Sequence, residues 1–336
     1  MAFDQHGRTI DYLRISVTDR CNLRCRYCMP EEGVPSKRHD AVLTLEEIAS
    51  FVRVAASEGF KRVRLTGGEP LVRLGIEDLV ANLHAIEGIE SIAMTTNGIL
   101  LPKMAEKLRE AGLSRVNISL DTLDPEQYRY ITRWGDIEDV FCGIDTALEM
   151  GFKPVKINAV VVRSLNQDLL SYARMSIERP LHVRFIEYMP VGDACGSDGL
   201  GWTQEDTIPN EELIALINQQ AEDSGLGSLE PISKPSETPA GWGPARYYHF
   251  KGAKGTVGFI SALSRHFCSE CNRLRLTVHG ELMPCLFSDT CFDVKAALRA
   301  GDDEAVRQVL LSALSSKPSE HYHKIGTEHY MSQIGG

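Results

Sequence analysis

The feature that most constrains the fold is a regular alternation of short β-branched runs with longer amphipathic stretches between Leu13 and Met189. This alternation is typical of βα units built around a parallel sheet. Six strands are predicted, at Leu13–Val17, Arg62–Thr66, Ser91–Thr95, Arg115–Leu120, Val155–Val162 and Val183–Tyr188. Six units are too few for a complete eight-fold barrel, so the pattern predicts an α/β fold with an open, partial (six-unit) βα barrel.

A helix is predicted from Leu45 to Ser57, where apolar side chains recur on one face. Thr44 stands directly before it, and Glu47 follows Thr44 by three residues. This spacing is that of a capping box, in which side chain and backbone satisfy each other at the first turn. We therefore expect the helix to begin directly after Thr44.

Beyond the barrel units the composition changes. The chain is rich in Gly and Asp from Pro190 to Gly201, and rich in Pro, Ser and Gly from Pro231 to Pro244, which indicates loop and linker. Short strands are then predicted at Tyr247–Phe250, Thr256–Ile260 and Arg273–His279, with a hairpin turn at His279-Gly280. We expect two parts: residues 1–230 form the barrel domain, and residues 231–336 form a smaller α+β region that closes the barrel mouth.

Charge and hydropathy limit the expected partners and the expected location of the protein. The formal net charge of −10 disfavours a general attraction to DNA or anionic membranes, so neither nucleic acid nor membrane is an expected partner. The longest apolar runs, such as Ile157–Val162, are far shorter than the roughly 20 residues of a membrane-spanning helix. The first residues lack the features of a secretory signal, so we expect a cytoplasmic location. In that compartment, 9 cysteines indicate metal or redox chemistry rather than disulfides.

Three of these cysteines, Cys21, Cys25 and Cys28, come directly after the first predicted strand. Three closely spaced thiols on a loop can face one iron–sulfur cluster, and a [4Fe-4S] cluster would then have one iron without a protein ligand. An open coordination position lets another molecule bind the metal. A zinc knuckle is the alternative, but the preceding strand and Met29-Pro30 are context that a zinc knuckle does not require.

The first triad, followed by Gly67-Gly68-Glu69-Pro70 after the second strand, resembles the radical S-adenosylmethionine (SAM) enzymes. The resemblance implies that the open iron binds the amino and carboxylate groups of SAM, and that the reduced cluster generates a 5′-deoxyadenosyl radical from it. The glycines have a physical reason of their own, because a backbone without side chains can approach a bound ligand closely.

The second triad consists of Cys268, Cys271 and Cys285. Cys291 lies close behind it, so four thiols could form a closed tetrahedral zinc site, and His266 or His279 could substitute for one of them. By itself this pattern favours structural zinc. With the first triad present, however, the stretch from Phe267 to Leu276 becomes more informative.

The stretch from Phe267 to Leu276, together with Leu13–Cys21 and the terminal Gly335-Gly336, is similar to the family of radical SAM enzymes that cyclise GTP in molybdenum cofactor biosynthesis. The similarity runs from about Asp11 to Gly336. It implies that the second triad holds another [4Fe-4S] cluster, whose open iron meets the guanine. It also implies a reaction in which the radical removes the ribose 3′ hydrogen and the carbon radical attacks C8, giving 3′,8-cyclo-7,8-dihydro-GTP.

The same resemblance implies partners and a role for the tail. A reductant protein and the downstream cyclic pyranopterin monophosphate synthase are expected, and a homodimer is one assembly that the chain could form. The diglycine end is expected to thread into the pocket. No residue is assigned a catalytic role beyond binding.

The spacing of the basic residues can be compared with the needs of a GTP site independently of the family resemblance. Arg62 and Arg64 alternate with apolar residues on one predicted strand, as Arg273 and Arg275 do around Leu274 on another. Side chains two apart point to the same face of a strand. An inward-facing set of cations needs counter-charge, which a triphosphate supplies, and the planar arginine fork can grip phosphate with two hydrogen bonds. We expect most of these residues near the C-terminal ends of the strands, where barrel enzymes build their active sites.

By motif position, the resemblance implies two sets of contacts. The residues expected to contact GTP are Arg14, Arg64, Thr95, Lys156, Arg273, Leu274 and Arg275, with Arg62 and Arg184 as further phosphate candidates. The residues expected to contact SAM are Tyr27, Gly68, Ser119 and Met189.

Two rival functions stay open at this point. A radical enzyme of this kind could act on a peptide instead of GTP. Alternatively, the protein could be a metal protein without catalysis, either an electron carrier or a zinc-pinned binding module. An electron carrier would want fully ligated clusters and needs no substrate barrel. Cys142 and Cys195 are interpreted as incidental thiols.

Overall fold

The structure is a computed structural model that describes residues 2–35, 38–190, 202–241, 243–321 and 331–334. The Gly- and Asp-rich stretch that ends at Gly201, Cys195 within it, and the terminal diglycine lie outside these residues. The predictions made for them therefore stay predictions. Among the described residues, no helix combines the length and the apolar character needed to cross a membrane.

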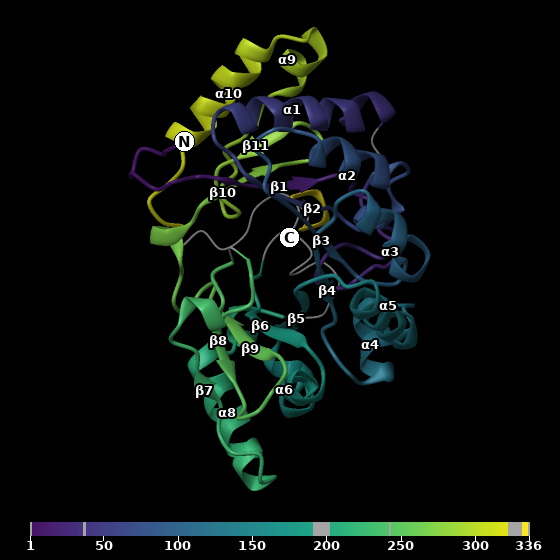
Figure 1. Ribbon diagram of the computed structural model, residues 1–336, viewed down its shortest axis with the longest axis vertical. Coiled ribbons are helices and arrows are strands. Elements are labelled where there is room, and N and C mark those ends of the chain that lie inside the picture. The colour runs from purple at the N-terminus through teal and green to yellow at the C-terminus, as the bar shows by residue number, and fades with distance from the viewer. Residues whose placement is uncertain (1, 36–37, 191–201, 242, 322–330, 335–336) are drawn as a thin grey trace.

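The first two thirds of the chain form the expected succession of parallel strands and helices, and the sheet does not close (Figure 1). The strands are β1 (Tyr12–Ser16), β2 (Arg62–Thr66), β3 (Ser91–Thr96), β4 (Arg115–Ser119), β5 (Val155–Val161) and β6 (Leu181–Glu187). The helices are α1 (Leu45–Ser57), α2 (Ile76–His84), α3 (Leu101–Glu110), α4 (Pro125–Thr132), α5 (Ile137–Glu149) and α6 (Leu169–Glu178). The predicted partial barrel is confirmed, with strand ends shifted by one or two residues.

The capping box at the first helix is confirmed as well. The Thr44 hydroxyl accepts a hydrogen bond from the Glu47 N–H at 3.2 Å, and the Glu47 carboxylate accepts one from the Thr44 N–H at 2.8 Å. Helix α1 then runs from Leu45 to Ser57, as predicted. Its apolar face contributes Ile48, Phe51 and Val52, all fully buried, to the layer between helices and sheet.

The C-terminal part extends the sheet at both edges, which the prediction of a mouth-closing region did not include. Strand β9 (Thr256–Ile260) pairs in parallel with β6, and β10 (Arg273–Leu276) pairs in parallel with β1. Beyond them, β8 (Arg246–His249) and β7 (Glu230–Pro231) add to one edge, and β11 (Glu281–Met283) and β12 (Phe292–Asp293) to the other. Figure 1 shows β10 and β11 in the upper half and β8 and β9 in the lower half.

Four further helices complete the described chain, namely α8 (Asn210–Asp223), α9 (Lys295–Ala300), α10 (Asp303–Ser315) and α11 (Met331–Ile334). Helices α9 and α10 contact α1, and α11 contacts β1. Because one sheet runs through residues of both parts, the boundary between residues 1–230 and 231–336 stays a prediction.

Each barrel strand has two buried faces with different chemistry. On β1, Leu13 and Ile15 are fully buried in the core beneath the helices. Tyr12 and Arg14 alternate with them and face the lumen of the barrel, where both line a cavity. This alternation lets the parallel strands present an apolar core on one side and a polar, cationic lumen on the other.

Candidate functional site

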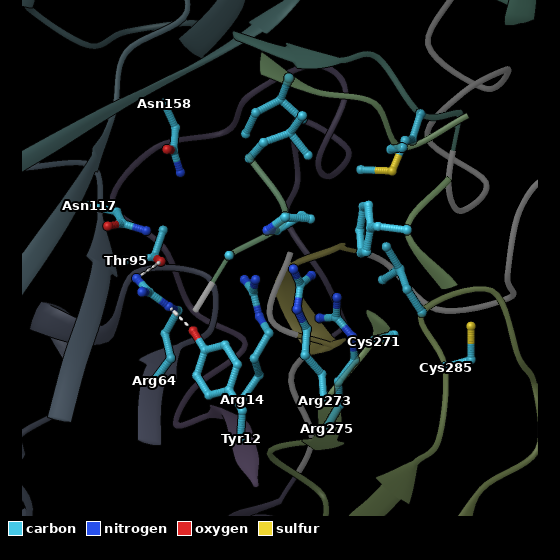
Figure 2. A pocket seen from close by; sticks show the side chains of 18 of the residues that line it. Tyr12, Arg14, Arg64, Thr95, Asn117, Asn158, Cys271, Arg273, Arg275 and Cys285 are labelled. Carbon is cyan, nitrogen blue, oxygen red and sulfur yellow. Dashed lines mark hydrogen bonds between the residues drawn. The ribbon is translucent and has the colours of Figure 1, made fainter. Parts of the chain in front are cut away.

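A cavity lies inside the barrel, and its wall is cationic (Figure 2). The cationic residues that line it are Arg14, Arg64, Arg115, Lys156, Arg184, Arg273, Arg275 and Lys317. They come from β1, β2, β4, β5, β6, β10 and the segment after α10. Figure 2 shows the guanidinium groups of Arg14, Arg64, Arg273 and Arg275 gathered side by side, with Asn117 and Thr95 on one flank and Cys271 and Cys285 on the other.

The expectation that these residues lie near the C-terminal ends of the strands is wrong for most of them. Arg14 and Arg64 are the central residues of β1 and β2, while Arg273 is the first residue of β10. Arg115 opens β4 and Lys156 is the second residue of β5. Because the unclosed barrel leaves its lumen accessible, side chains from the middle and the beginning of the strands line the cavity too. A ligand that reached all of them would extend deep into the barrel.

Arg64 organises one flank of the cavity. Its Nε donates a hydrogen bond to the Tyr12 hydroxyl, and its Nη1 donates to the Thr95 hydroxyl at 3.3 Å. With the Asn117 amide in the orientation that its neighbours require, the amide oxygen accepts from Arg64 Nη1 and Arg184 Nη2, at 2.6 Å each. Arg184 Nε also donates to Asn158 Oδ1 at 2.9 Å. Neutral oxygens thus hold the guanidinium groups in place.

The electrostatic cost of this arrangement is visible in the pKa values. Burial, followed by the charges of Arg184, Arg64 and Arg115, lowers the pKa of Lys156 to about 5. Burial also lowers the pKa of Arg275, to about 10, with the charge of Arg273 as the next cause. Cations that repel one another in a buried space are what an anionic ligand would stabilise.

Lys156 is held by the loop that the composition indicated as linker. Its Nζ donates to the carbonyl of Ala240 at 2.9 Å and to the Tyr247 hydroxyl at 3.2 Å. Gly241 has a φ of +144°, and a Cβ at that position would come 2.8 Å from Lys156 Nζ. The glycine therefore allows this loop to lie directly on the lysine.

Burial raises the pKa of Tyr12, but the charges of Arg64, Arg14 and Arg273 bring it down to about 8. Tyr12, Arg115 and Asn117 line the cavity although the sequence reasoning did not single them out. The sequence did contain a pattern that could have found them. Tyr12 precedes Arg14 by two residues and Arg115 precedes Asn117 by two, which is the spacing of side chains on one face of a strand.

Among the predicted GTP contacts, six lie where a ligand in the cavity would meet them: Arg14, Arg64, Thr95, Lys156, Arg273 and Arg275. Leu274 does not, because its side chain is fully buried in the core on the opposite face of β10. Only its backbone could contact a ligand. Of the two further phosphate candidates, Arg184 lines the cavity, whereas Arg62 forms an ion pair with Asp11 at 2.9 Å.

The second cysteine triad lies at the open side of the barrel. Strands β9 and β10 stand at opposite ends of the parallel part of the sheet, so the segment that joins them, residues 261–272, crosses the gap. It carries Cys268 and Cys271, and together with Cys285 these thiols line the same cavity as the arginines. Sequence spacing could not have shown that this triad faces the cationic lumen.

A lysine distant in sequence braces this triad. Lys317 is only 2% exposed, and its Nζ donates to the carbonyls of Arg273 at 2.9 Å and Pro284 at 2.7 Å. It also donates a hydrogen bond to the Cys271 sulfur. Burial raises the pKa of Cys271, but Lys317 and Arg273 together bring it below its ordinary value. The sequence reasoning missed this residue, and no local pattern marks it.

Single-ion coordination by either triad finds no support in the geometry. Among the described residues, the group whose three ligand atoms all lie within 4.8 Å of one another is His266, Cys268 and His321, and neither triad is such a group. The ligands of one zinc ion lie closer together than this. His279 is not among the residues that line the cavity, and its Nδ1 lies 3.3 Å from the carbonyl of Ala41.

Cys291 likewise lies outside the cavity lining. Its sulfur is half-buried, and burial together with Glu281 and Asp289 raises its pKa to about 11. The three lining thiols, wider apart than ligands of one ion and open to a cavity, fit a cluster with one vacant iron position.

The first triad is shaped by its own loop. The Cys28 N–H donates to the Cys25 carbonyl at 2.9 Å, and the Leu23 N–H donates to the Cys21 sulfur at 3.3 Å. Burial raises the pKa of Cys25, and the nearby Cys28 and Cys21 raise it further. A thiol kept protonated by burial becomes a good ligand once a metal cluster stabilises its thiolate.

The glycine pair after β2 packs against the backbone that leads into this triad. A Cβ on Gly67 would come 2.3 Å from the Thr18 carbonyl oxygen, and a Cβ on Gly68 would come 2.4 Å from that of Arg20. Gly67 also has a φ of +147°. The sequence predicted a close approach of this backbone to a bound ligand, and the structure shows a close approach to the chain directly before Cys21.

The remaining predicted SAM contacts occupy different places. Tyr27 lies in the loop of the first triad, and its hydroxyl donates to Asp121 Oδ2 at 2.6 Å. Ser119 is the last residue of β4 and half-buried. Met189 lines the cavity with the arginines, directly after β6.

The chain end approaches the same region. Ser332 in α11 donates its backbone N–H to the Cys28 sulfur, and the Ile334 carbonyl accepts from Arg275 Nη1 at 3.1 Å. Met331 lines the cavity. The residues directly before the diglycine thus reach both the first triad and the cationic wall.

Two family models match the chain. The one described as the Radical SAM superfamily matches residues 15–174, and the one described as Molybdenum Cofactor Synthesis C matches residues 181–323. Among curated proteins, the chain is 49% identical to the GTP 3′,8-cyclase of Pelotomaculum thermopropionicum and 50% identical to that of Moorella thermoacetica, in both cases over 99% of each chain.

Among solved structures, the chain is similar to Streptococcus suis SuiB bound to a precursor peptide and to SuiB bound to S-adenosylmethionine. The TM-scores are 0.60 and 0.59, at 16% and 17% identity, and the alignments cover 92% of this chain and 68% and 69% of those chains. This similarity concerns the fold.

Proposed function

The chain belongs to the GTP 3′,8-cyclase family of radical SAM enzymes, and from this premise we propose how its residues divide the work between two ligands. It catalyses the radical SAM cyclisation of GTP to (8S)-3′,8-cyclo-7,8-dihydroguanosine 5′-triphosphate, an early step of molybdenum cofactor biosynthesis. It uses SAM and [4Fe-4S] clusters. The proposal assigns GTP to the cationic cavity and SAM to the first triad.

One observation carries the assignment of GTP. The cavity has cations from six strands along its wall and the second cysteine triad at its open side. A nucleoside triphosphate has a strongly anionic end and a base whose nitrogen and oxygen atoms can bind a metal. The triphosphate would lie among Arg14, Arg64, Lys156 and the other cations, and the guanine would lie toward Cys268, Cys271 and Cys285.

SAM is assigned to the first triad because its neighbours form a backbone-lined site. Cys21, Cys25 and Cys28 would hold the cluster that it binds. Tyr27, Gly68 and Ser119 stand on the loop and strand ends around that triad, and Met189 lies on the wall shared with the cationic cavity. Both ligands would therefore meet near Met189, which brings the radical and the ribose into one space.

The chemistry is divided between cluster and chain. Cys21, Cys25 and Cys28 would hold a cluster that, when reduced, would supply the electron for the reductive cleavage of SAM. The arginines fix the triphosphate with paired N–H donors, which limits the positions that the ribose can take. The buried wall excludes water from the reacting atoms, so that competing reactions of a radical are suppressed.

Several partners remain proposals. The electron requires a reductant protein, and the product requires the downstream cyclic pyranopterin monophosphate synthase. We further propose a cytoplasmic location, where low-potential electron donors are available, and a homodimer as an assembly to be tested by sedimentation.

Anaerobic incubation of the reconstituted protein with GTP, SAM and dithionite tests the function. We expect 5′-deoxyadenosine and the cyclised nucleotide together, and their absence would reject the assignment. Turnover of a peptide in place of GTP would support the rival substrate class. Analysis for iron, sulfide and zinc separates a cluster enzyme from a zinc-pinned module.

The location of GTP is tested by Arg273→Ala. Arg273 is half-buried, and its buried Nε atom has no hydrogen-bond partner within the described residues. Loss of a charge-assisted contact costs about 1.5–3 kcal/mol, so the Kd for GTP should rise roughly 10- to 150-fold. Arg53→Ala, on the exposed face of α1, is the matched control. An unchanged Kd would remove Arg273 from the site.

A further inference from the structure

The cationic cavity contrasts with most nucleoside triphosphate sites in what it lacks. Such sites usually hold magnesium through a carboxylate or a hydroxyl of the protein together with the phosphate oxygens. The described residues that line this cavity include eight lysines and arginines. They include no aspartate and no glutamate. Within the described part of the chain, the wall therefore has no carboxylate that could coordinate a hard cation such as magnesium.

The neutral oxygens along the wall are already engaged by guanidinium groups. Asn117 turns its amide oxygen toward Arg64 and Arg184. Asn158 Oδ1 accepts from Arg184, and the Thr95 hydroxyl accepts from Arg64 at 3.3 Å. An oxygen that accepts from a guanidinium would have to bind magnesium directly beside that positive charge, which repels the dication.

Two further oxygen atoms near the anion site are engaged in the same way. The Tyr12 hydroxyl accepts from Arg64 Nε. The carbonyl of Ala240, which the loop places in the cavity, accepts from Lys156 Nζ at 2.9 Å. Each of these contacts directs a lone pair to an N–H donor of an arginine or lysine side chain, so these oxygen atoms face hydrogen-bond donors of the protein.

We propose that the cavity binds the nucleoside triphosphate in its magnesium-free form, and that magnesium competes with the protein for the nucleotide. The inference rests on the assignment of GTP to this cavity. The protein's cations take the place of the metal, because arginine forks and a lysine neutralise the phosphate oxygens that magnesium would otherwise bridge. A dication beside these guanidinium groups would also be repelled by them at short range in a buried space.

The affinity for GTP at different magnesium concentrations tests this proposal. GTP binding to the holoenzyme is measured by equilibrium dialysis while free Mg²⁺ is varied and ionic strength is held constant with KCl. Once most of the nucleotide is complexed, each tenfold rise in free Mg²⁺ should raise the apparent Kd about tenfold, by mass action. A Kd that is constant or falls as Mg²⁺ rises would overturn the inference and leave the function intact.

A second measurement follows the metal itself. The holoenzyme, with its clusters oxidised, is titrated into Mn²⁺–GTP, and free Mn²⁺ is detected by its six-line EPR signal. Release of Mn²⁺ in proportion to GTP bound supports the proposal, and retention of Mn²⁺ on the protein-bound nucleotide contradicts it. Failure to bind GTP at any metal concentration would overturn both this inference and the assignment of the cavity to GTP.

Discussion

Lys156 should make GTP binding depend on pH. Burial and the charges of Arg184, Arg64 and Arg115 lower its pKa from 10.5 to about 5, so in the empty cavity its amine is neutral at pH 7. A bound triphosphate stabilises the ammonium form and raises this pKa. GTP binding then takes up a proton, and the affinity rises as pH falls from the pKa of the complex toward about 5.

The magnitude follows from the same numbers. At pH 7, protonating a group whose pKa is about 5 costs about 2.7 kcal/mol, since one pKa unit corresponds to about 1.4 kcal/mol. The contact with phosphate must exceed that cost. A net contribution of about 1.5–3 kcal/mol predicts that Lys156→Met raises the Kd for GTP roughly 10- to 150-fold at pH 7.

Isothermal titration calorimetry in buffers of different ionisation enthalpy measures the proton uptake directly. Between pH 7 and 8.5 the wild-type protein should take up about one more proton per GTP than Lys156→Met. Tyr12, whose pKa is about 8, titrates in both proteins, so the difference isolates Lys156. Lys103→Met, on the exposed face of α3, controls for the loss of a charge. Equal proton uptake by wild type and Lys156→Met would refute the reasoning.

Four further substitutions probe the rest of the site. Cys25→Ala should abolish SAM cleavage, while Cys285→Ala should spare part of it and weaken GTP binding; equal loss of both activities would contradict the division between the triads. Gly68→Ala places a Cβ 2.4 Å from a carbonyl oxygen before the first triad, so unfolding should require about 1–3 kcal/mol less and iron content should fall, and an unchanged Tm would argue against this packing. Lys317→Met leaves two buried carbonyls without their donor, at about 1–3 kcal/mol each, and should lower the Tm and the iron bound at the second triad. Wild-type values for both would exclude the bracing role.

Local features of the molecule could be predicted from the sequence because their causes are local. The capping residues before α1 and the β-branched runs determine where elements begin, and the two-residue period assigned Arg64, Arg273 and Arg275 to strand faces. Leu274 was expected as a GTP contact from the resemblance and not from this period, and its side chain alternates away from the cavity.

The sequence by itself determined the alternation of strands and helices, the two cysteine triads and the presence of inward-facing cations, because spacing along the chain is enough to define a strand face or a metal-binding loop. Only the tertiary structure decided that β9 and β10 extend the sheet at both edges, that the second triad crosses the gap between them, and that Lys317 reaches Cys271 from the far end of the chain. The physical reason is that these contacts depend on how the unclosed sheet brings distant segments together, which is a property of the packed core and not of any short stretch of residues.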